Sequence, residues 1–332
     1  MVEDISTLYT YNFPLIPISR ISVDSPELKD YLYKELPVVI EGSNLVGPAL
    51  EKWDLGYLTE NLGDRGLYNV MQTKGHQMFK YFDQNKVTQL KGKMEFVLEA
   101  STDEMKFQEF VKRIQLPQRG RDTYSYLQQP LNDTVGPNIF SDFRRFNWEL
   151  VKRWSGDMKW GSLTNNMLLI GEPGNITPVH YDEQQNLFCQ VGGEKRCLLF
   201  HPRHFDKLYP YPVYHPCDRQ SKVNLRAPDL SLYPLVSQLE GMECVLSPGD
   251  VLYIPIYWWH QIESLEPDLT TSITFWFKAG SIDTISFPLS ATHKVAMMRN
   301  IEKMLTEALK DPKEINELFC NIVEGRYFKE EK

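Results

Sequence analysis

Two residues in the middle of the chain, His180 and Asp182, have the types and the spacing to bind one metal ion. In an extended strand, residues i and i+2 point to the same side, so this imidazole and this carboxylate can face one ion while Tyr181 points away. His260, which follows a predicted strand, would add a third ligand. Two imidazoles and one carboxylate leave about three positions of an octahedral metal open, as in non-haem Fe(II) oxygenases, where a 2-oxo acid and O2 bind.

Two further side chains could hold the distal carboxylate of such an acid. Lys195 lies in a strand-like run, and an adjacent strand could carry its ammonium into the same barrel. Thr177 could donate its hydroxyl. From spacing alone, Lys195 could equally be a surface lysine in the turn 192–196. For Thr177, an ordinary threonine in a turn is a better interpretation than a cosubstrate ligand. A His-x-Asp pair is also common by chance, so these residues alone do not establish that the protein binds a metal.

The elements that must position these residues are short β-like runs between about residues 123 and 279. Glycine and proline separate the runs, which cover residues 167–170, 186–191, 196–200, 243–246, 251–254 and 270–277. Many short strands with regular turns predict a barrel or jelly roll. The turn 247–250 precedes the strand 251–255, which we expect to deliver His260 to its far end.

The flanking segments differ from this core. Upstream, the pattern predicts a helix over 25–33, a buried strand over 37–40, a strand-like segment at 79–83 and a helix over 101–114. Downstream, an apolar helical face runs from about 290 to 319 and Pro312 breaks it into two helices. We predict a mixed α/β decoration over 1–120, a catalytic core over 121–285 and a C-terminal helical element over 286–332, whose apolar face could equally pack on the protein's own core or serve as a dimerisation element.

Composition excludes some classes of protein. The chain has 332 residues, 42% of them hydrophobic, so it can bury a sizeable core, and its net charge of −8 argues against direct nucleic-acid binding. The five scattered cysteines predict reduced, mostly buried thiols. Neither a signal peptide nor a run of eighteen apolar residues is present in the sequence, so we expect a cytoplasmic and nuclear protein without membrane contact.

Longer strings carry a resemblance to a known family. These strings are HYDEQQN at 180–186, YPYPVYHPCDRQS at 209–221 and PGDVLYIPIYWWH at 248–260. From about residue 37 to 327 the chain resembles the family of factor inhibiting hypoxia-inducible factor, asparaginyl hydroxylases in the JmjC branch of the cupin superfamily. The resemblance implies a mainly β fold: a double-stranded β-helix, the jelly roll of cupins, with flanking helices and a C-terminal helix pair.

The same resemblance implies the reaction. Such enzymes bind Fe(II), convert 2-oxoglutarate and O2 to succinate and CO2, and hydroxylate the β-carbon of a peptide asparagine, with ascorbate as reductant. The implied substrates are a hypoxia-inducible-factor-like transcription factor and ankyrin-repeat proteins, which would give the enzyme an oxygen-sensing role. The C-terminal helices would form a homodimer.

Site residues carry over from the matching motifs. The cosubstrate would be held by Tyr126, Thr177, Asn186, Lys195 and Thr274. The peptide would be bound by Tyr81, Asp83, Gln128, Gln184, Arg219, Gln220 and Trp276, with Gln220 on the target amide. The dimer interface would include Met298, Ile301, Leu305 and Phe319. Met167 and Leu169 would face the cosubstrate.

Two departures from the family pattern and two competing functions remain. Thr274 stands where the family has asparagine, and Lys80 replaces an apolar groove residue. A JmjC enzyme of the same chemistry could instead demethylate methyl-lysine. A catalytically idle scaffold that binds ankyrin proteins belongs to another class, and the intact set of His180, Asp182 and His260 argues against it.

Overall fold

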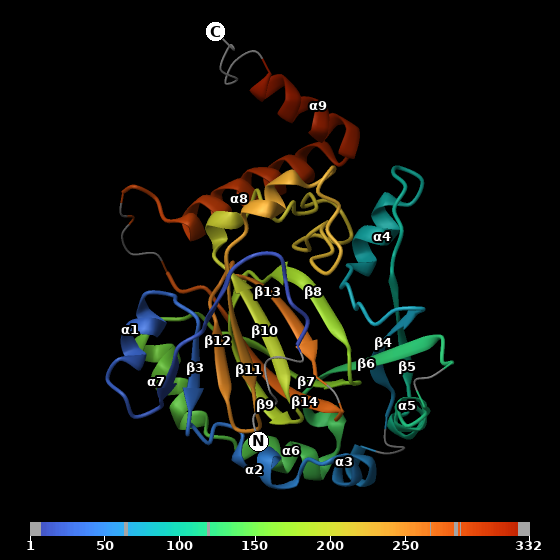
Figure 1. Ribbon diagram of the computed structural model, residues 1–332, viewed down its shortest axis with the longest axis vertical. Coiled ribbons are helices and arrows are strands. Elements are labelled where there is room, and N and C mark those ends of the chain that lie inside the picture. The colour runs from blue at the N-terminus through green and yellow to red at the C-terminus, as the bar shows by residue number, and fades with distance from the viewer. Residues whose placement is uncertain are drawn as a thin grey trace.

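The strands of the computed structural model form two sheets that face each other as a flattened barrel (Figure 1). The structure describes residues 8–62, 66–117, 120–265, 267–281, 285 and 287–324. The smaller sheet has the order β1 (Leu15–Pro17), β11 (Gly241–Leu246), β10 (Lys195–Phe200), β13 (Trp259–Ser264), β8 (Ile176–Tyr181). The larger sheet has the order β2 (Arg20–Ser22), β3 (Val38–Glu41), β12 (Val251–Ile254), β9 (Gln184–Gly192), β14 (Thr270–Lys278), β7 (Leu163–Gly171), β6 (Thr123–Pro130), β4 (Tyr68–Lys74), β5 (Ala100–Met105).

The chain from β7 to β14 passes repeatedly between the two sheets. Strands β7, β9, β12 and β14 lie in the larger sheet, while β8, β10, β11 and β13 lie in the smaller one, and neighbours within each set are antiparallel. This alternation is the double-stranded β-helix. The predicted fold class is therefore confirmed.

Side chains of the larger sheet alternate between two apolar layers. In β9, Leu187 and Cys189 pack in the cluster shared with the flanking helices, whereas Phe188 packs in the cluster between the sheets. Both faces of this strand are covered, which explains why β9 reads as a continuous apolar run in the sequence. The site described below lies among the side chains that point between the sheets.

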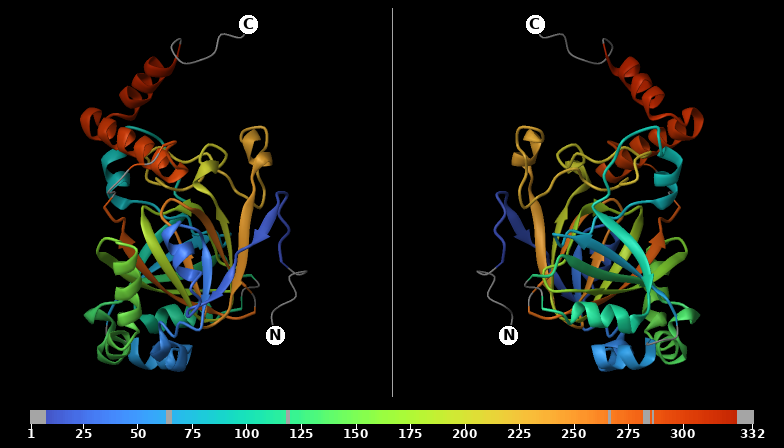
Figure 2. Two further views of the ribbon diagram at one scale, coloured as in Figure 1. Left: turned by 90° about the vertical axis from the view of Figure 1, so that its left-hand side faces the viewer. Right: turned by 90° about the vertical axis from the view of Figure 1, so that its right-hand side faces the viewer.

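The helices cover the outside of the barrel and its two ends. They are α1 (Leu28–Tyr33), α2 (Gly47–Lys52), α3 (Leu55–Leu62), α4 (Gln84–Leu90), α5 (Phe107–Ile114), α6 (Pro137–Arg144), α7 (Trp148–Asp157), α8 (Ala291–Leu309) and α9 (Pro312–Val323), with 3-10 turns at Asp133–Val135, Pro202–His204 and Pro234–Gln238. Helices α2, α3 and α6 lie at one end of the barrel, and α8 lies at the other, with α9 projecting beyond it (Figures 1 and 2). No helix in the described ranges is long and apolar enough to cross a membrane.

Several local predictions are confirmed. Each of the six apolar runs lies within a strand, and Pro312 begins the second C-terminal helix at its first position, where a missing N–H costs nothing. Ser290 caps the first of these helices by accepting from the backbone N–H of His293. All five cysteines are free thiols, and four of them are buried.

Other local predictions were wrong. Residues 101–105 of the predicted helix belong to strand β5, and only Phe107–Ile114 is helical. The segment 79–83 forms no strand, and only its neighbour Met78 makes an isolated bridge, to Ile176. For β5 the ladder with β4 overrides the helical pattern, since pairing along a sheet edge satisfies the backbone while the side chains stay exposed. Strands β1–β5 extend both sheets. The boundary at residue 120 between the N-terminal decoration and the catalytic core stays a prediction.

Candidate active site

The three predicted metal ligands meet on neighbouring strands of the smaller sheet. His180 in β8 is the direct cross-strand partner of His260 in β13, and Asp182 follows the end of β8. One ligand atom from each residue lies within 4.8 Å of the others, and His260 Nε2 is 3.8 Å from Asp182 Oδ2. His260 therefore lies in a strand of its own beyond a turn at Tyr257, which has a positive φ of 63°, and not at the end of β12 as expected.

Backbone carbonyls fix the orientation of both imidazoles. Nδ1 of His180 lies 2.9 Å from the carbonyl of Pro178, and Nδ1 of His260 lies 3.0 Å from that of Trp258. A carbonyl can only accept, so each Nδ1 carries the hydrogen and donates it, which leaves each Nε2 as a bare lone pair for a metal. Burial and the neighbouring His260 lower the pKa of His180 to about 3, and burial also lowers the pKa of His260. Both rings are neutral ligands at physiological pH.

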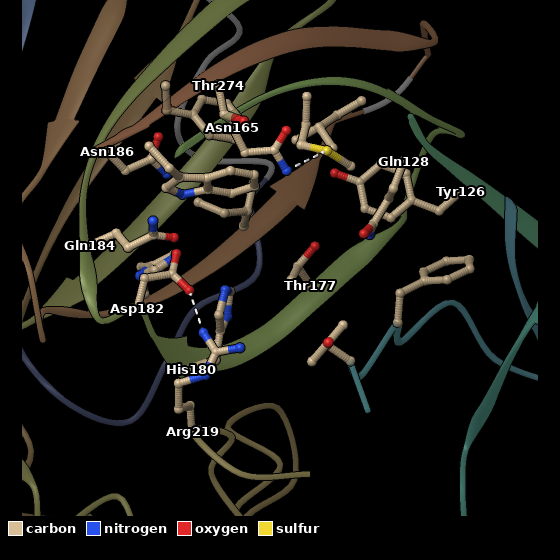
Figure 3. Close-up of a pocket in the computed structure, with 18 of the residues that line it drawn as sticks. Tyr126, Gln128, Asn165, Thr177, His180, Asp182, Gln184, Asn186, Arg219 and Thr274 are labelled. Atoms are coloured by element: carbon tan, nitrogen blue, oxygen red, sulfur yellow. Dashed lines mark hydrogen bonds and ion pairs between the residues drawn. The ribbon is translucent and has the colours of Figure 1, made fainter. Parts of the chain in front are cut away.

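Arg219 orients the carboxylate of Asp182. Its Nη1 donates to Asp182 Oδ1 over 2.8 Å (Figure 3). The other oxygen, Oδ2, is left facing His260. Burial opposes ionisation of Asp182, but the two imidazoles and Arg219 outweigh it and lower the pKa of Asp182. The carboxylate is thus anionic and has one oxygen available. Sequence reasoning placed Arg219 in the peptide site and missed this role, because the two residues are far apart in the chain.

A cavity of about 390 Å³ opens on the ligand set. It is lined by Phe79, Tyr81, Tyr126, Gln128, Asn165, Met167, Leu169, Thr177, His180, Asp182, Gln184, Asn186, Phe188, Arg219, Gln220, His260, Ile262, Thr274 and Trp276. Among these, buried Asn186 Oδ1, Gln220 Oε1 and Thr274 Oγ1 have no hydrogen-bond partner in the structure. Buried polar atoms are normally paired, so these three fit a polar ligand inside the cavity.

The donor set fits Fe(II) better than a structural metal. Two imidazole nitrogens and one carboxylate oxygen occupy one side of the site, and the cavity opens on the other. Thiolates are typical of structural zinc, and no cysteine is among the residues that line the cavity. The ligands present therefore fit a metal that keeps several positions open for exchangeable ligands.

Lys195 lies behind the cavity wall. Its side chain is 1% exposed, and its Nζ is 3.5 Å from the hydroxyl of Tyr126 and 5.2 Å from the ring centroid of Phe188. Burial lowers the pKa of Lys195 to about 7, and no carboxylate of the described chain forms an ion pair with it. The strand β10 that carries it is separated from β8 by β13, so the expected adjacency of the two strands was wrong.

The remaining predicted cosubstrate residues lie on the wall itself. Tyr126 on β6 and Thr177 on β8 line the cavity from opposite sheets. Thr274 on β14 pairs with Met167 on β7, and both line the cavity, as does Leu169. The structure thus places four of the five predicted cosubstrate residues, Tyr126, Thr177, Asn186 and Thr274, on the wall of one cavity.

The predicted peptide residues divide into two groups. Six of the seven line the cavity, namely Tyr81, Gln128, Gln184, Arg219, Gln220 and Trp276, and Tyr81 is 45% exposed at its mouth. Asp83 does not line it. Its carboxylate accepts from the backbone N–H groups of residues 85 and 86 and caps α4.

Asn165 is a cavity residue that sequence reasoning missed. It lies on β7 next to Met167, whose sulfur accepts from its amide at 3.2 Å. Within β7 it is two positions before Met167 and so points to the same side. This alternation was the only signal that could have found it.

The structure also locates the predicted interface residues. Met298 and Ile301 on α8 are 40% and 45% exposed. Leu305 and Phe319 instead pack, partly buried, against Tyr214 and Ile315. The first pair is available for a partner, whereas the second pair joins α8 to α9 and to the loop below.

Fold and ligand set together define a metal-binding cupin. Residues 24–282 match the cupin-like domain family, and the chain belongs to this family. It is 28% identical over 249 residues to lysine-specific demethylase 8 of Xenopus tropicalis, covering 74% of this chain and 49% of that protein. It is 30% identical over 252 residues to lysine-specific demethylase JMJ30 of Arabidopsis thaliana, covering 75% and 52%.

A third relative is matched along most of its own length. The tRNA wybutosine-synthesizing protein 5 of Homo sapiens is 30% identical over 269 residues, which cover 79% of this chain and 78% of that protein. By contrast, the chain spans about half the length of the two demethylases. JmjC members of this family are 2-oxoglutarate oxygenases that use Fe(II).

Proposed function

We propose that the chain is an Fe(II)- and 2-oxoglutarate-dependent protein hydroxylase that oxidises the β-carbon of asparagine. The observation that carries this proposal is the set of His180, Asp182 and His260 facing a cavity whose opposite wall bears unpartnered polar atoms. Bound Fe(II) would supply the chemistry by which O2 and 2-oxoglutarate yield succinate, CO2 and a hydroxylated C–H bond. The residues of the chain hold, orient and enclose the reactants.

The cosubstrate would lie between the ligand set and the inner wall. Its distal carboxylate would accept from the hydroxyls of Tyr126 and Thr177, with the ammonium of Lys195 behind them. Asn186 and Thr274 would pair with oxygens nearer the metal. The apolar side chains of Leu169, Phe188 and Ile262 exclude water from this end.

Gln220 supports asparagine as the target. Its side chain is 1% exposed, lines the cavity and has an unpartnered Oε1, and its backbone forms a bridge with that of His180. A buried carboxamide pairs well with another carboxamide, which offers both a donor and an acceptor. An unpaired amide would penalise side chains that lack this group.

These features support a place in the family of factor inhibiting hypoxia-inducible factor. The proposed substrates are the activation segment of a hypoxia-inducible-factor-like transcription factor and ankyrin-repeat proteins. Dependence on O2 would make the enzyme an oxygen sensor in the cytoplasm and nucleus. Tyr81, Gln184 and Trp276 at the mouth of the cavity would bind the extended peptide.

Mass spectrometry tests this proposal directly. The protein is incubated with Fe(II), ascorbate, 2-oxoglutarate and peptides from both substrate classes, and we expect a gain of one oxygen on asparagine. Matched peptides with aspartate or histidine at the target position test whether these side chains are oxidised as well, and a peptide with alanine there serves as the control. Absence of oxidation across the asparagine panel, together with succinate production on another substrate, would contradict the assignment.

Methyl-lysine demethylation is the second candidate, favoured by the names of two relatives. The cavity supports it less well. Asp182 is the only carboxylate among the lining residues, and it already faces Arg219 and the metal position. A methylated ammonium would find no other anion there. Formaldehyde release from methylated peptides would support demethylation. Modification of tRNA by the protein would instead support the activity named for the third relative.

A homodimer through the C-terminal helices is part of the proposal. Met298 and Ile301 are exposed on α8, together with Met297 and Met304, which are 52% and 63% exposed. A contiguous apolar face of this kind usually marks an interface. Light scattering should give twice the mass of the chain, and Met298→Glu combined with Ile301→Glu should give a monomer. A wild-type monomer at micromolar concentration would exclude the dimer.

A further inference from the structure

Helix α8 contacts the active site through one buried side chain, Arg299. This arginine is 2% exposed, although the neighbouring Met297 and Met298 on the same helix are exposed. Figures 1 and 2 show α8 crossing the end of the barrel at which β8 ends and β13 begins. The inner side of the helix therefore lies over the segments that carry the metal ligands.

The guanidinium of Arg299 binds both residues that flank Asp182. Its Nε donates to Glu183 Oε1 over 2.9 Å, and its Nη1 donates to the hydroxyl of Tyr181 over 2.7 Å. The ring of Tyr181 packs edge-on against Trp259, which precedes His260, with centroids 4.6 Å apart. The arginine thus fixes the backbone on either side of the carboxylate ligand.

The same guanidinium also holds the segment that carries Arg219 and Gln220. Nη1 donates to Asp218 Oδ1 over 2.8 Å, and Nη2 donates to Asp218 Oδ2 over 3.1 Å. This bidentate pair is buried on both sides, with side-chain exposures of 2% and 11%. Arg219 is the next residue, and it orients Asp182 directly. Both routes from Arg299 converge on the same carboxylate.

We infer that Arg299 is a positioning residue for the metal centre, through which α8 sets the geometry of Asp182 and Arg219. Its contacts are strong because a planar, permanently charged fork binds two carboxylates and a hydroxyl at once. Loss of this fork would free Asp182 to rotate and would shift Gln220, without removing any group that touches metal or substrate. The expected loss of metal affinity does not depend on the proposed function. The expected change in the ratio of succinate to hydroxylated peptide rests on it.

The test compares full-length variants in Mn(II) binding, followed by electron paramagnetic resonance of the free ion. Substitution of metal-site partners beyond the ligands typically costs about 10- to 100-fold in affinity. We expect Arg299→Gln to weaken Mn(II) binding about tenfold and Arg299→Lys to weaken it by about threefold, because lysine keeps the charge but not the fork. Lys303→Met is the matched control, since Lys303 donates to the same Glu183 but is 45% exposed.

Far-UV circular dichroism identifies which variants fold, and the ratio of succinate to hydroxylated peptide gives a second readout. The positioning role predicts a higher ratio for Arg299→Gln and an unchanged one for Lys303→Met. If Arg299→Gln does not fold, Arg299→Lys and Glu183→Gln decide, each with an expected loss of Mn(II) affinity of about threefold. Folded Arg299 variants with wild-type Mn(II) affinity would overturn the inference, and so would a Lys303→Met variant that loses as much Mn(II) affinity as Arg299→Gln. Wild-type protein that binds Mn(II) but oxidises no asparagine would contradict the proposed function and leave the positioning role of Arg299 intact.

Discussion

The two ends of the cavity differ in how completely their polar atoms are paired. At the metal end, both Nδ1 atoms and Asp182 Oδ1 have partners within the protein. Along the inner wall, which here means all the residues proposed to hold the cosubstrate, Asn186 Oδ1 and Thr274 Oγ1 have none in the structure, and Lys195 is buried without a carboxylate partner in the described chain. The protein thus organises the metal end by itself, whereas the inner wall is completed only by a ligand. Substitutions at the two ends should therefore differ in kind as well as in size.

The largest effect is expected at the metal end. Asp182→Ala removes the only anionic ligand and leaves Arg219 without its partner, so metal binding and succinate production should fall by at least about 1000-fold. Metal titration and succinate release measure the two losses. His180→Ala should also abolish iron binding. Succinate production by Asp182→Ala would show that the metal lies elsewhere, and binding of ankyrin proteins without any turnover in the wild type would favour the idle scaffold.

The metal end is also the part of the site that the sequence predicted best. His180 and Asp182 could be placed because a period of two along a strand is a local property. The pairing of Arg219 with Asp182 depends on how a long loop folds back, and no local pattern encodes it. The same contrast holds for the fold: the covered strand β9 reads as an apolar run, whereas the polar edge strand β5 is defined only by its neighbour β4.

A substitution at Lys195 tests the inner wall. Lys195→Met keeps the length of the side chain and its burial but removes the charge, so the KM for 2-oxoglutarate should rise about 50-fold, which corresponds to ~2.3 kcal/mol for a charged hydrogen bond. Steady-state succinate assays measure this, and Mn(II) affinity should stay at the wild-type level as the control for the metal end. Unchanged KM would place the carboxylate anchor on another residue.

The pH dependence of the same residue sharpens the comparison. Because burial lowers the pKa of Lys195 to about 7, its ammonium form is present below that pH and lost above it. Pairing with a carboxylate requires the ammonium, so the KM for 2-oxoglutarate should rise about tenfold per unit at pH above about 7. Lys195→Met should abolish this slope. A slope that persists in the variant would assign the titration to a different group.

Gln220 lies beside the metal ligands, since its backbone forms a bridge with that of His180, but it is not itself a ligand, and its substitution should show an intermediate effect. Gln220→Leu leaves the metal ligands intact but removes the carboxamide proposed to pair with the target, so kcat/KM for the peptide should fall about 20-fold, or ~1.8 kcal/mol. Succinate production without peptide should stay unchanged, and quantitative mass spectrometry separates the two. Equal hydroxylation by the wild type of matched peptides with asparagine and with alanine at the target position would argue against amide recognition.

The smallest effect is expected at Thr274. The sign of the stability change in Thr274→Val shows whether the hydroxyl on the cavity wall is unpaired or paired in the ligand-free protein. The hydroxyl is 1% exposed and has no partner in the structure, so Thr274→Val should leave stability unchanged or raise it by up to about 1 kcal/mol, because an unsatisfied buried group is removed. If that hydroxyl pairs with the cosubstrate, the same variant should raise the KM for 2-oxoglutarate by about threefold, or ~0.7 kcal/mol. Thermal melts with and without 2-oxoglutarate measure both, and the stabilisation given by the ligand should shrink in the variant. Lower stability of the ligand-free variant would show that the hydroxyl is already paired, which would remove the contrast between the two ends at this residue.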